Sequence, residues 1–317
     1  MKRHKINLNT YKSKVKNGVS RENYWTQVRE LLTQINEFSE LQEFFGNKIT
    51  IQDSEIVLET RATKKYPSVI KMRIIPNDIR SAPFSIVADG YYEPYQADLL
   101  MELGKQSKHF IDVGANMGFY SLALSAENES LIVDSFEPQP NVCKILNENI
   151  LLNKFNSRIT THNYGLGSSR GELILYVPKF TGSGGSSFQD LHPDEGESTQ
   201  ILVPVNLLDD FSETYVDLIK LDVEGSELNV IDGAERLLNL ATPTIVAELL
   251  RKWMRPFGHS PQMFLEKMNS YGYECLAICT DFLKPITLID DSTVETNFIF
   301  VHSDKKSHKE ILEKHVN

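Results

Sequence analysis

The chain has 317 residues, of which 41% are hydrophobic and 24% charged, and its formal net charge is −10. This composition is ordinary for a globular protein, and the negative charge disfavours non-specific binding to nucleic acid or to an anionic membrane. We find no run of about 18 apolar residues, so no membrane span is expected. The three cysteines, Cys143, Cys275 and Cys279, are too few and too scattered for a disulfide framework and fit a reducing cytoplasm.

The sequence pattern of the N-terminal part of the chain predicts a separate extension. Residues 20–45 repeat apolar side chains at helical spacing, and residues 49–80 alternate weakly, which predicts short strands. We therefore divide the chain into an N-terminal extension, residues 1–85, and a main domain, residues 86–317. The helix is a candidate contact for a homo-oligomer, and the extension is equally a candidate cover for a ligand site.

From residue 108 onward, apolar strands alternate with amphipathic helices. We expect strands at 109–113, 131–136, 158–164, 216–223, 243–250, 273–279 and 297–302, a hairpin arm at 171–177, and helices at 119–126, 141–152, 225–240 and 261–271. This alternation predicts an α/β fold with a mostly parallel, doubly wound sheet that has helices on both faces. In such sheets ligands bind beyond the carboxyl ends of the strands, so the residues after each strand are candidate site residues.

The turn after the first of these strands reads DVGANMG, from Asp112 to Gly118. It lacks both the G-x-G-x-x-G pattern that accepts a dinucleotide pyrophosphate and the G-K-[ST] triplet of a P-loop. An acid before the glycines would repel a phosphate and suit a cation. S-adenosylmethionine carries an ammonium and a sulfonium instead of phosphates, so the turn favours this cofactor over NAD or ATP. Glycines at this turn would let the cofactor lie against the backbone.

Glu137 ends the next strand, where an acid commonly accepts two hydrogen bonds from a ribose diol. A surface acid beside a helix N-terminus is the alternative interpretation. Together with Asp112 and the missing third glycine, Glu137 favours the adenosyl cofactor.

The order of six motifs resembles that of the FkbM-type methyltransferases, class I enzymes with a Rossmann-like fold that use S-adenosylmethionine. The motifs are GYYEPYQADLL, FIDVGANMGFYSLAL, FEPQPNVCKILNENILLN, NYGLGSSRGEL, GSGGSS and IKLDVEGSELNVIDGAERLL, and they cover roughly residues 86–280. The resemblance implies that the glycine turn lines the methionine side, that Glu137 binds the ribose and that residues 163–166 flank the adenine. With the residues at the other strand ends, the expected cofactor site comprises Glu93, Asp112, Gly114, Asn116, Gly118, Glu137, Pro138, Asn163, Gly165, Leu166 and Asp222.

A second acidic block, DVEGSE, places Asp222 and Glu224 at the end of the strand at 216–223. Residues two apart in a strand share a face, so both carboxylates are candidates for one cleft. Methyl transfer is an in-line displacement, and a nearby carboxylate would act as base or electrostatic partner. The structural alternative is a helix start capped by Ser226. With Glu248 these acids are also conceivable Mg²⁺ ligands, but no compact ligand motif is present and we assign no metal.

His259 completes the expected catalytic set of Asp222, Glu224 and His259, because its loop follows the strand at 243–250 and its pKa range suits a general base. A solvated or turn-capping histidine is the alternative. Tyr92 and Glu93 are expected to close over the cofactor or to pack against the core, and the GSGGSS loop is a candidate lid.

These expectations describe an S-adenosylmethionine-dependent methyltransferase. By resemblance, the acceptor is a hydroxyl of a sugar, glycan or other small metabolite, and no nucleic acid is expected as a partner. Two alternatives stay open: a nicotinamide-dependent oxidoreductase, which the missing third glycine opposes, and a non-catalytic binding protein on the same fold.

Overall fold

The computed structural model describes residues 48–317 apart from 53–54, 61–67, 76–77, 79, 179–183, 192–197 and 212–214. The helix expected at 20–45 and its oligomer contact lie outside the described residues. The described part of the chain forms one compact unit.

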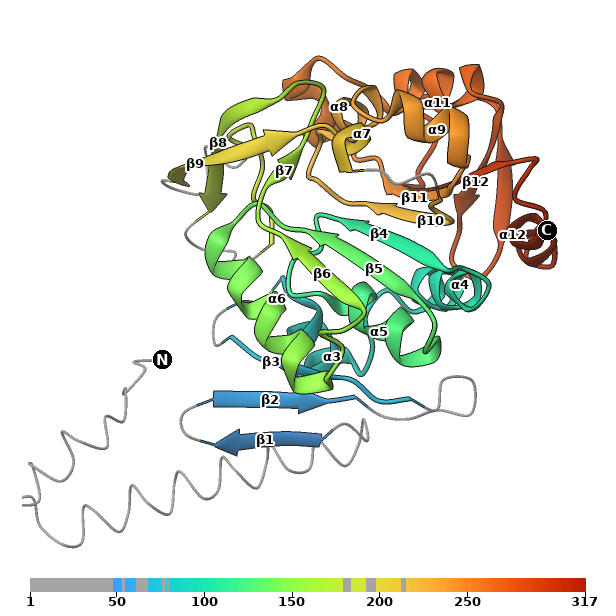
Figure 1. The fold of residues 1–317 in the computed structure, drawn as a ribbon. Coiled ribbons are helices and arrows are strands. Elements are labelled where there is room, and N and C mark those ends of the chain that lie inside the picture. The colour runs from blue at the N-terminus through green and yellow to red at the C-terminus, as the bar shows by residue number, and fades with distance from the viewer. Residues whose placement is uncertain are drawn as a thin grey trace, which may run out of the picture. The chain divides into compact units, whose positions relative to one another are not determined.

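An eight-stranded sheet forms the centre of this unit, with the strand order β13-β12-β14-β11-β10-β4-β5-β6. Figure 1 shows β11, β10, β4, β5 and β6 lying side by side in this order. Its strands are β4 (His109–Val113), β5 (Ile132–Phe136), β6 (Ile159–His162), β10 (Leu218–Leu221), β11 (Thr244–Glu248), β12 (Tyr273–Ile278), β13 (Leu283–Ile286) and β14 (Asn297–His302). The five strands from β6 to β11 are mutually parallel, whereas β14 runs antiparallel to both β11 and β12. The structure thus confirms the predicted doubly wound α/β fold.

Successive apolar side chains of the strands point to opposite faces of this sheet, and helices pack against them on both faces. Phe110 and Val133 belong to the core that packs against one helical layer, and Ile111 and Ile219 belong to the core on the opposite face. The helices of the first layer are α4 (Pro94–Lys105), α5 (Phe119–Glu127), α6 (Pro140–Asn153) and α12 (Lys306–Glu313); those of the second are α8 (Glu227–Asp232), α9 (Glu235–Ala241) and α11 (Pro261–Ser270).

The helix expected at 225–240 is instead two helices, α8 and α9, separated at Gly233. A Cβ at Gly233 would lie 2.1 Å from the carbonyl oxygen of Gly167, so the backbone approaches closely there. The Gly233 carbonyl also accepts a hydrogen bond from the Asp209 N–H at 2.9 Å. A neighbouring loop, rather than local propensity, breaks this helix.

Two small sheets flank the central one. The first contains β1 (Lys48–Gln52), β2 (Glu55–Glu59) and β3 (Lys71–Arg73), and the second contains β7 (Gly165–Leu166), β8 (Gly171–Pro178) and β9 (Ser198–Asn206). The remaining helical segments are α3 (Ala82–Asp89), α7 (Leu208–Phe211), α10 (Arg251–Met254) and the 3₁₀ turn η2 (Arg255–Phe257). The first small sheet is joined to α6 by hydrogen bonds from the Lys71 and Arg73 N–H groups to Asn153 and Asn149.

Among the described residues, none of the helices combines the length and hydropathy that crossing a bilayer requires.

Candidate active site

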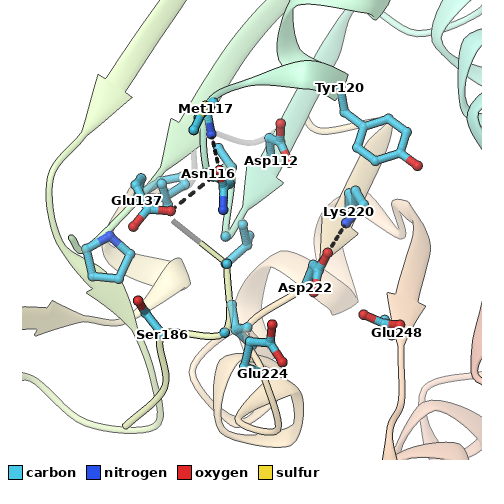
Figure 2. A pocket seen from close by; sticks show the side chains of 18 of the residues that line it. Asp112, Asn116, Met117, Tyr120, Glu137, Ser186, Lys220, Asp222, Glu224 and Glu248 are labelled. Atoms are coloured by element: carbon cyan, nitrogen blue, oxygen red, sulfur yellow. Dashed lines mark hydrogen bonds and ion pairs between the residues drawn. The ribbon is translucent and has the colours of Figure 1, made fainter. Parts of the chain in front are cut away.

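A cavity lies over the carboxyl ends of β4, β5, β10 and β11 (Figure 2). Sequence order reverses between β4 and β10, because β5 follows β4 on one side and β10 adjoins it on the other. Val113 pairs with both Phe136 and Leu221, so the three strands end level and their following residues meet. Of the expected site residues, the cavity is lined by Glu93, Asp112, Gly114, Asn116, Glu137, Pro138, Gly165, Leu166, Asp222 and Glu224.

The glycine turn owes its shape to positive φ angles at Gly114 (79°), Asn116 (50°) and Gly118 (89°). Its N–H groups at Gly114 and Ala115 both donate to the Phe136 carbonyl at 3.0 Å. A Cβ on Gly114 would lie 1.8 Å from the Asp222 carbonyl oxygen. Gly114 therefore lets the ends of β4 and β10 meet, in addition to opening the turn toward the cavity.

Gly118 lies beneath the turn rather than on the cavity lining. A Cβ there would lie 2.4 Å from Leu146 of α6, so this glycine allows α5 to begin close against α6. Its position is structural, at the base of the turn that lines the cavity.

Asp112 is buried and bonded to the chain itself. Its Oδ2 accepts hydrogen bonds from the Ser121 N–H at 3.1 Å and the Ser121 hydroxyl at 2.6 Å. Burial raises the pKa of Asp112, with Lys220 opposing the increase. The side chain thus ties β4 to α5 while it borders the cavity.

Glu137 directly follows β5 and stabilises the glycine turn through hydrogen bonds. Its two carboxylate oxygens accept the Asn116 N–H at 3.0 Å and the Gln139 N–H at 2.8 Å. Burial raises the pKa of Glu137 to about 7. Asn163 lies behind it, outside the lining, and donates to the Glu137 and Pro138 carbonyls at 2.9 and 3.2 Å.

A buried lysine that the sequence analysis did not single out lines the cavity beside Asp222. The Lys220 ammonium donates to Asp222 Oδ2 at 2.8 Å and lies 4.9 Å from the centroid of the Tyr120 ring. Although burial opposes it, the carboxylates of Asp222 and Glu93 raise the pKa of Lys220, so it is protonated at neutral pH. A charged residue inside the otherwise apolar run LIKL was the available signal.

Glu93 enters the cavity from the start of α4 and has a left-handed backbone, with φ 41°. Its Oε2 accepts hydrogen bonds from the Tyr120 hydroxyl and from Gln96 Nε2, the latter at 2.7 Å. Burial raises the pKa of Glu93. Tyr92 also lines the cavity and packs edge-on against Phe119, with ring centroids 5.1 Å apart.

Glu224 and Glu248 contribute two further acids. Glu224 is left-handed, with φ 52°, in the turn after β10, and Glu248 is the last residue of β11. Burial, followed by repulsion from Asp222, raises the pKa of Glu224 to about 7 and that of Glu248 to about 9. The structural alternative, a helix start capped by the Ser226 side chain, is not observed, since α8 has no side-chain cap at that residue.

The loop at 184–188 closes one side of the cavity. The Ser186 hydroxyl donates to Gln139 Oε1 at 3.0 Å, and the Ser187 hydroxyl donates to the Glu224 carbonyl at 2.8 Å. The loop therefore bridges the β5 side and the β10 side; the first residues of the expected GSGGSS lid lie outside the described residues.

The structure does not bring His259 to the cavity lining. This residue follows η2, and its ring stacks on Phe257 with centroids 6.2 Å apart and an interplanar angle of 18°. Burial lowers its pKa. His162, in β6, donates a hydrogen bond from its Nε2 to Asp134 Oδ1 at 2.8 Å and is likewise outside the cavity lining.

Within the described part of the chain, no group of three or more His, Cys, Asp and Glu side chains is arranged to hold a metal ion.

The family described as the methyltransferase FkbM domain matches residues 112–275, which include the glycine turn and the Asp222–Glu224 block. The chain belongs to the FkbM methyltransferase family. This match confirms the expected family and the expected class of enzyme, a methyltransferase.

Two relatives of this FkbM-family chain are named methyltransferases. Methyltransferase sdnD of Sordaria araneosa is 28% identical over 187 residues, which are 48% of this chain and 69% of that protein. Hexuronic acid methyltransferase AglP of Haloferax volcanii is 27% identical over 151 residues, 47% of this chain and 59% of that protein. Among solved structures, methyltransferase FkbM from Methylobacillus flagellatus aligns with a TM-score of 0.39 and 22% identity, over 61% of this chain and 43% of that one.

Proposed function

We propose that this methyltransferase uses S-adenosylmethionine and transfers its methyl group to a hydroxyl oxygen of a sugar, glycan or other small metabolite. The observation that carries the proposal is a set of carboxylates at the aligned carboxyl ends of adjacent strands. They surround a glycine turn whose sequence lacks a phosphate-binding pattern. Asp112, Glu137 and Asp222 follow or end three adjacent parallel strands.

The chemistry of the lining fits this cofactor. The acids suit its ammonium and sulfonium charges, and the buried ammonium of Lys220 is already bonded to Asp222 and so offers little to a phosphate. Glu137 oxygens each accept one backbone N–H, and because a carboxylate offers about four lone-pair sites, capacity remains for a ribose diol. We assign Asp112, Gly114 and Asn116 to the methionine side.

We assign the adenine side to the residues at the ends of β5 and β7. Pro138, Gly165 and Leu166 line the cavity there, and Asn163 supports the wall through the Glu137 and Pro138 carbonyls. Apolar and backbone surface of this kind suits a flat heterocycle.

When bound, S-adenosylmethionine supplies a methyl group activated by a cationic sulfur. The acceptor hydroxyl must lose a proton, and a base whose pKa lies near the working pH removes it most effectively. Glu224, with a pKa raised to about 7, has this property, and we propose it as the base. Lys220 orients the Asp222 carboxylate, which we propose as the electrostatic partner; His259 has no role in this scheme.

The proposal is tested first by binding. Thermal unfolding is followed with S-adenosylmethionine, S-adenosylhomocysteine, NAD or no ligand; a ligand at about 100 times its dissociation constant stabilises by about 2.7 kcal/mol. We expect a shift with both adenosyl compounds, followed by transfer of a labelled methyl group to hydroxylated acceptors. A shift with NAD alone would contradict the proposed cofactor.

Glu137→Gln locates the cofactor site. The amide keeps one acceptor oxygen but turns its NH₂ toward a backbone N–H and removes the charge that would bind the ribose. Because a hydrogen bond to a charged group is worth about 1.5–3 kcal/mol, we expect affinity for S-adenosylhomocysteine to fall about 10- to 100-fold in calorimetry. Glu129→Gln, at an exposed turn, is the matched control. Equal affinity in both variants would place the cofactor elsewhere.

A further inference from the structure

The cavity has two ends of different chemistry. Asn116 and Glu137 stand on one side, whereas Lys220, Asp222 and Glu248 stand together on the other (Figure 2). The proposed cofactor occupies the side of β4 and β5. The side of β10 and β11, with the start of α4, is therefore left for the acceptor, and we call it the acceptor end.

Carboxyl groups outnumber cations at the acceptor end. Its four acids are Glu93, Asp222, Glu224 and Glu248. Lys220 lies among them, and its ammonium is bonded to Asp222 at 2.8 Å and stacked over Tyr120. The lysine therefore neutralises part of this charge but is not available as a separate anchor for an anion.

Among the described residues that line the cavity, Arg80 is the second cation. Its charge lowers the pKa of Glu224, but burial and repulsion from Asp222 still leave that pKa at about 7. Among the described lining residues, the four carboxyl groups of the acceptor end thus face two cations.

The protonation state of Glu248 indicates how the acceptor end responds to further negative charge. Burial and then repulsion from Asp222 raise the pKa of Glu248 to about 9, so its carboxyl group is neutral at neutral pH. An incoming carboxylate or phosphate would meet the same desolvation and the same repulsion. Hydroxyl groups carry no charge and meet no such repulsion, and hydrogen bonds donated to Asp222 and accepted from protonated Glu248 would offset their smaller desolvation cost.

We propose that the acceptor end selects neutral, hydroxyl-rich acceptors and rejects those whose reacting ring carries a carboxylate or phosphate. This inference rests on the proposed function and narrows its substrate class. It separates this chain from its Haloferax volcanii relative, whose name assigns it a hexuronic acid.

The test uses pairs of acceptors in which the CH₂OH group at C6 of the sugar is replaced by a carboxylate. Phenyl glucoside is compared with phenyl glucuronide, and phenyl galactoside with phenyl galacturonide, at saturating labelled S-adenosylmethionine. Acceptor affinity is measured independently by calorimetry in the presence of S-adenosylhomocysteine. We expect the neutral member of a pair to have at least about tenfold higher kcat/KM and tighter binding, since like charges brought together cost several kcal/mol.

Two substitutions at Glu248 link this preference to the acceptor end. Glu248→Lys places a cation at the acceptor end. We expect the ratio of kcat/KM for the neutral acceptor to kcat/KM for the acidic acceptor to fall at least about fivefold, or to drop below one. Glu248→Gln keeps the neutral, hydrogen-bonding character, and we expect the preference for the neutral acceptor to remain. The exposed Glu129→Lys controls for the change in total charge and should leave the ratio unchanged.

The outcomes separate this inference from the proposed function. Failure to bind either adenosyl compound would remove the proposed function itself. If the cofactor binds, the inference is overturned when the acidic member is bound or methylated better, when no neutral member binds or reacts, or when Glu248→Lys leaves the ratio unchanged.

Discussion

Asp112 and Glu137 hold the backbone around the cavity as well as facing it. Asp112 accepts two hydrogen bonds from Ser121, and Glu137 accepts one N–H on each carboxylate oxygen. Replacing either acid with alanine would leave buried donors without partners, which costs about 1–3 kcal/mol for each group. Loss of cofactor binding in an alanine variant would therefore not distinguish a contact from a collapsed turn, which is why Glu137→Gln is the sharper substitution.

Glu227 determines the shape of the turn that carries Glu224. Its Oε1 accepts the Val223 N–H at 3.2 Å and the Gly225 N–H at 3.1 Å, on either side of the left-handed Glu224. Its Oε2 is buried and has no hydrogen-bond partner among the described residues. We infer that Glu227 stabilises the left-handed conformation that directs Glu224 to the cavity.

Burial raises the pKa of Glu227 from 4.5 to about 8, which predicts a pH-dependent stability. At a pH below 4.5 the carboxyl group is neutral in both folded and unfolded chains. As pH rises from 4.5 to about 8, the unfolded chain releases the proton and the folded chain keeps it, so the free energy of unfolding falls. Glu227→Gln stays neutral throughout and retains an acceptor oxygen.

We therefore expect Glu227→Gln to lose less stability than the parent protein between about pH 5 and about pH 8. The difference should be at least about 1.4 kcal/mol, the free-energy equivalent of one pKa unit. Urea unfolding at the two pH values measures it. Identical pH slopes for parent and variant would mean that Glu227 ionises in the folded protein as readily as in the unfolded chain.

At the scale of elements, the site depends on how closely β4 approaches β10. The Asp222 N–H donates to the Val113 carbonyl at 3.0 Å, and a Cβ on Gly114 would overlap the Asp222 carbonyl oxygen. The strand ends can carry their acids to one cavity only because no side chain separates them there.

Gly114→Ala should therefore be strongly destabilising. The added Cβ would lie 1.8 Å from a backbone oxygen, which cannot move without breaking the β4–β10 contact, so we expect a loss of at least about 3 kcal/mol in denaturant unfolding, together with loss of cofactor binding. Gly258→Ala is the matched control: its φ of 76° nearly equals the 79° of Gly114, but no atom lies within 4 Å of the added Cβ. That variant should lose only about 1–2 kcal/mol, the cost of a left-handed alanine. Similar losses in both would assign the effect to φ rather than to the close approach.

At the scale of the whole molecule, one buried amide connects the first small sheet to the glycine turn. Asn149 on α6 accepts the Arg73 N–H of β3 at 2.8 Å and donates to the Met117 carbonyl at 2.9 Å. Its side chain is 0% exposed, so neither partner can turn to water if it is removed. The β1-β2-β3 sheet is thus coupled to the turn that borders the proposed cofactor.

We expect Asn149→Ala to reduce stability by about 2 kcal/mol or more and to speed hydrogen exchange at both β3 and residues 114–118. Asn153→Ala, one turn further along α6, removes bonds to Lys71 but none to the glycine turn. It should speed exchange at β3 alone. Protection at 114–118 that is equal in the two variants would show that Asn149 does not couple the regions.

Local pattern was enough to predict the parallel sheet and most of its helices, and most of the site residues predicted in this way line the cavity. Strands recur as apolar runs, and their carboxyl ends necessarily share an edge, so Asp112, Glu137 and Asp222 could be grouped from chain order alone. The FkbM methyltransferase family was identifiable for the same reason, because its motifs lie at those ends.

Features that depend on contacts between distant segments could not be predicted in this way. The helix break at Gly233 depends on the close approach of Gly167. The direction of Glu224 depends on a turn whose N–H groups bond to Glu227. His259 lies outside the cavity lining because η2 directs its loop elsewhere. Lys220 appeared only as a charge in an apolar strand until the structure placed it against Asp222 and Tyr120. Periodicity determines which face of an element is buried and which end of a strand is open, but which side chains meet there is decided by packing between segments far apart in the chain.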